Sequence, residues 1–298
     1  MQTTCCKQAI FYEQLTVKQP FININKISGM KKFFISAAFA LLSVGAFAQN
    51  VQLHYDFGHN AYNKGDKDLS TRAYLTTTVE MFKPDSFGST FFFVDMDYLS
   101  RNNPGGTTRG VVGAYWEIAR ELCFWQGTKM DWLSVHVEYN GGLNVTGSKF
   151  YNEKGGEDTG LKGLSFNNAF LAGLTYSGHS KDFRRTWSLS AMYKLIPKTI
   201  NAAGNKDYHN FQITGVWGIN FAKDWCTFSG FVDFWREARP WQGTKYIFLT
   251  EPQFWVNFNQ IKGWENVHLS LGTEVEMSVN FAGKGFYAIP TLAAKWTF

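Results

Sequence analysis

Carboxylates and aromatic rings recur at alternate positions along much of this chain, and they are the side chains best suited to bind a ligand. Aromatic faces beside carboxylates suit a flat, polar, neutral molecule that stacks on the rings while its hydroxyl or amino groups donate to the acids. The alternative for each residue is structural, with rings that fill space and acids that pair with neighbouring bases. The candidate binding residues are Tyr74, Glu80, Phe91, Phe93, Asp95, Asp97, Tyr115, Glu117, His136, Glu138, Asp233, Trp235, Trp255, His268, Glu274 and Glu276.

The histidines offer a second kind of chemistry. His136 and Glu138 are two positions apart on one alternating face, as are His54 and Asp56, so each pair could bind a metal ion. Hydrogen bonding within a wall of strands is the interpretation that we favour for both pairs. No serine occurs in a Gly-x-Ser-x-Gly context. The sequence therefore predicts no catalytic residue, no metal site and no cofactor.

The candidate residues belong to segments in which apolar and polar side chains alternate. Within residues 266–280, for example, Leu269, Leu271 and Val275 alternate with Ser270 and Glu274. A transmembrane barrel must repeat this pattern on every strand, because one face meets lipid and the other faces a wet interior. Twelve segments of this chain show the alternating pattern, and they lie near residues 51–58, 71–82, 89–99, 110–122, 132–143, 166–177, 185–196, 208–221, 225–236, 246–259, 266–280 and 285–298. The sequence thus predicts an all-β fold, a transmembrane antiparallel β-barrel of about twelve strands.

Both ends of the chain predict the same location. The last segment ends at Phe298, and a terminal aromatic residue on an amphipathic strand resembles the C-terminal signal of bacterial outer-membrane β-barrels. Residues 30–48 combine a basic start, an apolar stretch too short to span a bilayer and a small-x-small cleavage pattern, so they read as a signal peptide. We interpret residues 1–29 as an upstream extension that results from a start site assigned in error. We expect the barrel to comprise residues 49–298 and to lie in the outer membrane of a Gram-negative bacterium.

The connections provide an independent test of this topology. If both termini lie in the periplasm, every second connection faces outward and can be long, while the others stay short. The connections mostly alternate between long and short, with the long ones on the outward side as this topology predicts. Residues 144–165 form the longest outward connection, which we expect to be a surface loop. Pro252 and Pro290 are unfavourable for the tenth and twelfth strands, because each removes one donor from the hydrogen-bond ladder.

Charge bears on what such a barrel could bind. The whole chain has a net charge of +5, but five of its 29 basic residues and one of its 24 acidic residues precede Gln49. The predicted barrel keeps 24 basic and 23 acidic residues, so its charge is no argument for nucleic-acid binding. Its inward positions carry many acids against Arg72, Lys194 and Lys295. About twelve strands imply a narrow or plugged pore, and an acidic one should disfavour anions.

Several stretches resemble the nucleoside-specific channel-forming outer-membrane proteins, the Tsx-like family. They are residues 72–85, residues 91–98 with Asp95, residues 115–121 with Glu117, and residues 208–235 with Asp233. Ala119 stands where that family has a proline before its arginine. The resemblance implies a monomeric twelve-stranded barrel with a narrow nucleoside-binding channel.

The sequence leads to one main expectation and three alternatives. We expect a channel for small neutral polar solutes, most of all nucleosides, surrounded by outer-membrane lipid and inserted by the barrel-assembly machinery through the strand that ends at Phe298. The alternatives are a non-specific or cation-preferring small porin, a structural or surface-binding barrel, and, least favoured, an outer-membrane hydrolase.

Overall fold

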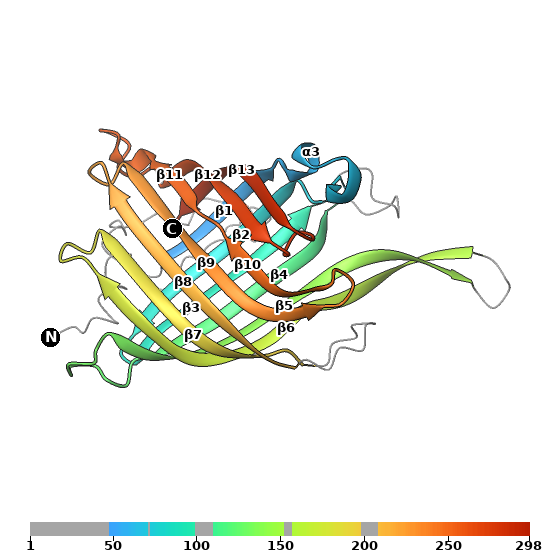
Figure 1. Cartoon of the computed structure of the whole chain (residues 1–298). Helices are drawn as coiled ribbons and strands as arrows, with labels where there is room; N and C mark the ends of the chain where they lie inside the picture. Colours follow the sequence, from blue (N-terminus) through green and yellow to red (C-terminus); the bar gives the residue numbers. More distant parts are fainter. Residues whose placement is uncertain (1–47, 71, 99–109, 152–156, 198–207) are drawn as a thin grey trace, which may run out of the picture.

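The protein folds into a closed antiparallel β-barrel (Figure 1). The computed structural model describes residues 48–70, 72–98, 110–151, 157–197 and 208–298. Within these, strands that follow each other in sequence pair with each other except β10 and β11, and β1 pairs with β13 to close the wall. The strands are β1 (Ala48–Asp56), β2 (Leu75–Asp85), β3 (Gly88–Tyr98), β4 (Val111–Leu122), β5 (Leu133–Tyr151), β6 (Glu157–His179), β7 (Arg185–Leu195), β8 (His209–Phe221), β9 (Cys226–Arg239), β10 (Thr244–Thr250), β11 (Gln253–Asn257), β12 (Leu269–Val279) and β13 (Phe286–Thr297).

Short helical segments occur only in connections of the described part of the chain. They are α3 (Gly58–Ala61) and η1 (Gly65–Lys67) after β1, and η2 (Phe258–Gln260) after β11. None of the helices in the described residues is long and apolar enough to cross a membrane.

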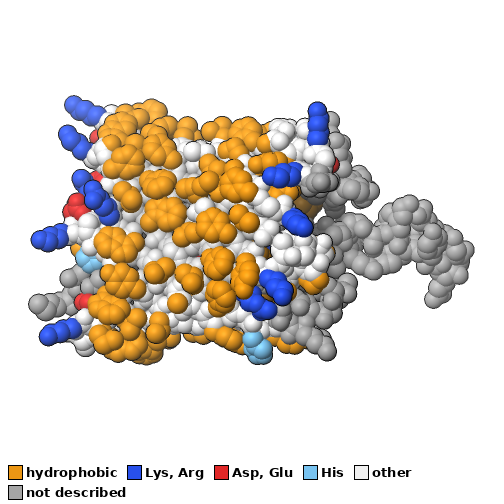
Figure 2. Space-filling view, in the orientation of Figure 1, with side chains coloured by type: hydrophobic (Ala, Val, Ile, Leu, Met, Phe, Trp, Pro, Cys, Tyr) orange, Lys and Arg blue, Asp and Glu red, His pale blue; other side chains and the backbone are white. Residues whose placement is uncertain are grey.

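The alternation of side chains decides which face of each strand lies outside. On β13, Leu292 and Trp296 are exposed on the outer surface together with the terminal Phe298, whereas Tyr287 and Ile289 are buried on the inner side. Figure 2 shows the result for one side of the molecule, where apolar side chains cover the wall and Lys and Arg lie toward its two ends. The outer surface is therefore the apolar belt that a lipid-facing barrel requires.

β10 and β11 together form the predicted tenth strand, which is interrupted at its middle. Both β10 and β11 pair with β9 on one side and β12 on the other, so the twelve predicted strands are all present. The interruption is Glu251-Pro252, because Pro252 has no N–H to donate. Its carbonyl still accepts a hydrogen bond from the Val275 N–H (3.1 Å), and the Glu251 N–H donates to the Phe231 carbonyl (3.2 Å).

Pro290 is accommodated at the seam where the barrel closes. β1 pairs with β13 only as far as Thr291, and the rest of β13 has a free edge on that side. The segment after β1 covers this edge: the Phe57 N–H donates to the Pro290 carbonyl (3.1 Å), and the Tyr62 hydroxyl bonds the N–H (3.0 Å) and the carbonyl (3.2 Å) of Ala288. Pro290 thus lies where no neighbouring strand needs its missing donor.

One predicted connection and one predicted strand boundary differ from the structure. The described residues of the predicted loop at 144–165 are strand, because β5 continues to Tyr151 and pairs with β6 from Glu157 onward. The result is a long hairpin that projects beyond the rim of the barrel (Figure 1). The second predicted strand was placed near 71–82, but β2 begins only at Leu75. The predicted upstream extension, residues 1–29, and the predicted signal peptide up to Phe47 lie outside the described residues.

Gly230 on β9 should be intolerant of a side chain, because it packs against the interrupted strand. Its φ is +152°, and a Cβ at this position would lie 2.5 Å from the Glu251 carbonyl oxygen and 3.0 Å from the Cα of Pro252. We expect Gly230→Ala to destabilise the folded barrel by about 1–3 kcal/mol. Urea unfolding in detergent micelles, followed by circular dichroism, measures this. Gly163→Ala is the control, because nothing lies within 4 Å of the added Cβ; equal stability of the two variants would contradict the prediction.

Candidate functional site: an acidic and aromatic lumen

The inside of the barrel is one elongated cavity of about 1730 Å³. We call the end where β1 begins and β13 finishes the terminal end, and the opposite end, where the β5–β6 hairpin projects, the hairpin end. The cavity is lined by Phe82 and Gln260 at the terminal end and by Arg239 and Phe281 at the hairpin end. It therefore extends along the whole axis of the barrel.

Most of the residues predicted from the sequence lie on the wall of this cavity. They are Glu80, Phe91, Phe93, Asp95, Asp97, Tyr115, Glu117, His136, Glu138, Asp233, Trp235, His268, Glu274 and Glu276. Their alternate spacing within each strand is the reason that they share one face.

Two predicted residues, Tyr74 and Trp255, do not line the cavity. Tyr74 precedes β2, and its ring packs near those of His59 (5.6 Å between centroids) and Tyr55 (6.2 Å), in a cluster at the hairpin end. Trp255 faces inward but is 0% exposed. It is covered by Lys295, whose Nζ lies 4.1 Å from the centroid of the indole, and its Nε1–H donates to Gln253 (3.0 Å).

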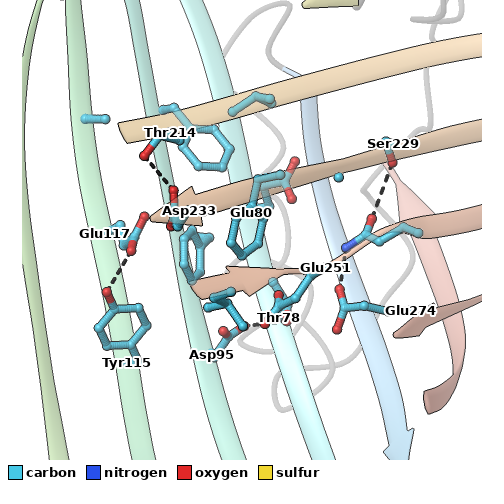
Figure 3. Close-up of a pocket in the computed structure, with 18 of the residues that line it drawn as sticks. Thr78, Glu80, Asp95, Tyr115, Glu117, Thr214, Ser229, Asp233, Glu251 and Glu274 are labelled. Carbon is cyan, nitrogen blue, oxygen red and sulfur yellow. Dashed lines mark hydrogen bonds between the residues drawn. The ribbon is translucent and has the colours of Figure 1, made fainter. Parts of the chain in front are cut away.

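Carboxylates from opposite sides of the wall converge near the middle of the lumen, as Figure 3 shows for Glu117, Asp233, Asp95, Glu251 and Glu274. They come from different strands, and their charges interact across the cavity, Glu117 with Asp233 and Asp95 with Glu251. Carboxyl groups that face one lumen suit cations or positively polarised groups better than anions.

Two of these carboxylates, Asp95 and Asp233, are each held by a donor directly across from them on the neighbouring strand. Thr78 donates to Asp95 (2.5 Å) and Thr214 to Asp233 (2.5 Å). Both are register partners, Thr78 of Asp95 in the β2–β3 pair and Thr214 of Asp233 in the β8–β9 pair. Opposed residues of antiparallel strands point to the same face, so the strand register places a hydroxyl donor beside Asp95 and another beside Asp233.

Two basic residues of the lumen, Arg72 and Lys194, donate hydrogen bonds to side chains of the barrel wall. Arg72 donates to Asp56 (2.7 Å) and to Glu276 (2.5 Å). Burial alone would lower the pKa of Arg72, but the adjacent carboxylates of Glu276 and Asp56 outweigh it and raise this pKa, so the guanidinium stays charged. Lys194 donates to Gln212 (2.7 Å), and its Nζ lies 4.8 Å from the Trp235 ring centroid.

His136 joins two acids near the terminal end. Its Nδ1 is 2.6 Å from Glu121 and its Nε2 is 2.9 Å from Glu138, while Ser134 and Thr175 also donate to Glu121. Within the described ranges, no three His, Cys, Asp or Glu side chains are arranged to hold a metal ion. The histidine is therefore part of a hydrogen-bonded wall.

Sequence reasoning missed several residues of this wall. Glu121 has the same alternating phase as Glu117 in one predicted segment, so the periodicity alone could have identified it. Gln212 and Gln253 were passed over because they carry no charge, although they hold Lys194 and Glu274 in place. Arg239 was assigned to a connection, but β9 extends to it.

Comparison with solved structures shows similarity to other β-barrel proteins. The chain is similar to the β domain of the Bordetella autotransporter BrkA (9% identity, TM-score 0.39), over 85% of this chain and 99% of that one. It is also similar to Omp33 of Acinetobacter baumannii (9%, 0.38, covering 85% and 98%) and to the outer membrane channel DcaP of the same organism (10%, 0.32, covering 85% and 96%). Scores at this level carry no residue or function over to this chain.

No curated protein matches the sequence. A family model does match it, over residues 48–298, which is the whole barrel. That model differs from the nucleoside channel family that several strands resemble. The chain belongs to the family described as "Domain of unknown function (DUF5020)".

Proposed function

We propose that this protein is a monomeric outer-membrane channel whose narrow, acidic and aromatic lumen passes small polar solutes and disfavours anions. The observation that carries the proposal is the single cavity lined by residues of both ends of the barrel. A wall that is apolar outside and polar inside supports placement in a membrane, because lipid and water each meet the side chains that suit them (Figure 2).

The charges of the lumen favour cations and neutral solutes over anions. Arg72 and Lys194 are already engaged with acceptors on the wall, which makes these two side chains less available to a passing anion. Carboxyl groups from several strands point into the centre of the lumen (Figure 3). A negatively charged ring at a constriction selects for cations.

Nucleosides are the specific solutes that we propose. Phe91, Phe93 and Tyr115 form a row of rings, with centroids 6.1 Å and 5.9 Å apart, and the Tyr115 hydroxyl donates to Glu117 (2.6 Å). A flat base can stack on such a row while its sugar hydroxyls donate to nearby acids. The main alternative is a non-specific, cation-preferring porin, which the same wall supports without any bound solute.

Neutralising the central acids should reduce selectivity for cations. We expect Asp95→Asn with Glu251→Gln to lower the K⁺ over Cl⁻ permeability ratio by about twofold or more, because two facing charges leave the constriction. The measurement is the reversal potential of the purified protein in planar bilayers under a KCl gradient. Asp182→Asn, on an exposed connection at the terminal end, is the control. An unchanged ratio would exclude these acids from the conducting path, and the absence of any pore would exclude a channel.

Nucleoside block tests the specific solute. We expect millimolar adenosine to reduce the K⁺ current of the unmodified protein, and Phe93→Leu to weaken this block by about fivefold, since stacking of a base on an aromatic ring contributes roughly 1–3 kcal/mol. Phe211→Leu is the matched control, because Phe211 lies exposed on the outer face. If adenosine and thymidine leave the current unchanged, the pore is a non-specific one.

A further inference from the structure

The wall beside the central acids has hydrogen-bond acceptors that the protein does not fill. We infer that Glu117, Glu138 and Asn140 form a subsite for the protonated amino group of an organic solute with an apolar body. The inference rests on the proposed function, which gives the solute access to the lumen, and it narrows the solute to a chemical class.

The three residues form one compact surface on β4 and β5. Asn140 is the register partner of Glu117, and its Nδ2 donates to Glu117 Oε1 (3.3 Å). Glu138 is two positions earlier on β5, so it faces the same side. All three side chains line the cavity.

Two acceptor atoms of this surface have no hydrogen-bond partner. They are Glu138 Oε1 and Asn140 Oδ1. The Glu138 side chain is only 9% exposed and Asn140 only 2%, so both acceptors are withdrawn from bulk water. A buried acceptor without a donor is unfavourable, and more so when it is charged. The pair can accept donors from a solute, and an ammonium group supplies up to three.

The charged side chains around these three residues suit a positively charged solute. The carboxylates of Glu117, Glu138 and Asp233 interact with one another, and Lys194 is the cation whose charge acts on all three. Lys194 is held toward β8 by its hydrogen bond to Gln212. His136 occupies the other oxygen of Glu138. These three carboxyl groups share two basic neighbours, Lys194 and the His136 imidazole, so acceptor oxygens outnumber the basic groups around them.

Apolar side chains lie on both sides of the acids. Glu138 is the register partner of Leu171 on β6, which is buried in an apolar cluster with Met192 and with Ala169, and Ala169 lines the cavity. On the other side, the ring of Tyr115 adjoins that of Phe93. This combination suits a cation with a hydrocarbon or aromatic body better than it suits a hydrated inorganic ion.

A matched pair of ligands tests the subsite. The full-length protein in detergent micelles is titrated calorimetrically with 2-phenylethylammonium and with 2-phenylethanol, which share a ring and a chain but differ in charge. We expect the amine to bind at least about tenfold more tightly than the alcohol, since charge-assisted hydrogen bonds are stronger than those between neutral groups. Equal binding of the two ligands, or no binding of the amine, would overturn the inference.

Variants locate the site within the acidic lumen. Glu138→Gln and Glu117→Gln should each weaken amine binding by about tenfold. Glu274→Gln removes a carboxylate from β12, outside the subsite, and should weaken it by less than about threefold, the residual long-range effect of one lumen charge. Circular dichroism confirms that each variant is folded. Equal losses in all three variants would mean that the amine responds to the overall charge of the lumen, and the subsite would be rejected.

The calorimetric result is independent of conduction. A protein that binds the amine but forms no pore in bilayers would contradict the proposed channel and leave the subsite in place. A protein that conducts K⁺ but does not bind the amine would contradict the subsite alone.

Discussion

Pairing of backbone N–H and C=O groups between neighbouring strands is the constraint on which the rest of this structure depends. A strand edge without a partner leaves a row of unsatisfied polar groups, and closing the sheet removes both edges at once. Here closure is completed by β1 and β13, and where β1 ends, the Tyr62 hydroxyl substitutes for a strand by bonding both backbone groups of Ala288. The two prolines in the wall are tolerated because their carbonyls still accept hydrogen bonds.

Closure also organises the interior, because it sets the register of every strand pair. Thr78 opposes Asp95 and Thr214 opposes Asp233, so a hydroxyl donor faces each of these acids. Gln253 opposes Glu274 in the same way and donates to it at 2.6 Å. A shift of one residue would send each member of these pairs to the outer face. The same hydrogen bonds that close the wall thus place the polar network that lines it.

Acids and bases in the lumen have different roles. Arg72 is held by Asp56 and Glu276 and connects β1 with β12 near the seam of the barrel, and Lys194 is held by Gln212. The central acids receive fewer charged partners, and the unfilled acceptors of Glu138 and Asn140 lie among them. Retaining uncompensated acceptors costs stability, which is a typical price for a binding surface. This contrast connects the proposed channel with the proposed amine subsite.

The alternating pattern was sufficient to predict about twelve strands and the inner or outer face of most of their side chains. A period of two is a local property of the chain, so Phe298 and Leu292 could be assigned to the outside and Glu117 and Glu274 to the inside without knowledge of their neighbours. Which inward residues meet became known only from the folded barrel. Lys295 covers Trp255, Glu117 interacts with Asp233 across the lumen, and Tyr74 packs in the cluster at the hairpin end because β2 begins after it. Such contacts depend on register and closure, which join residues far apart in the chain and leave no trace in a local pattern.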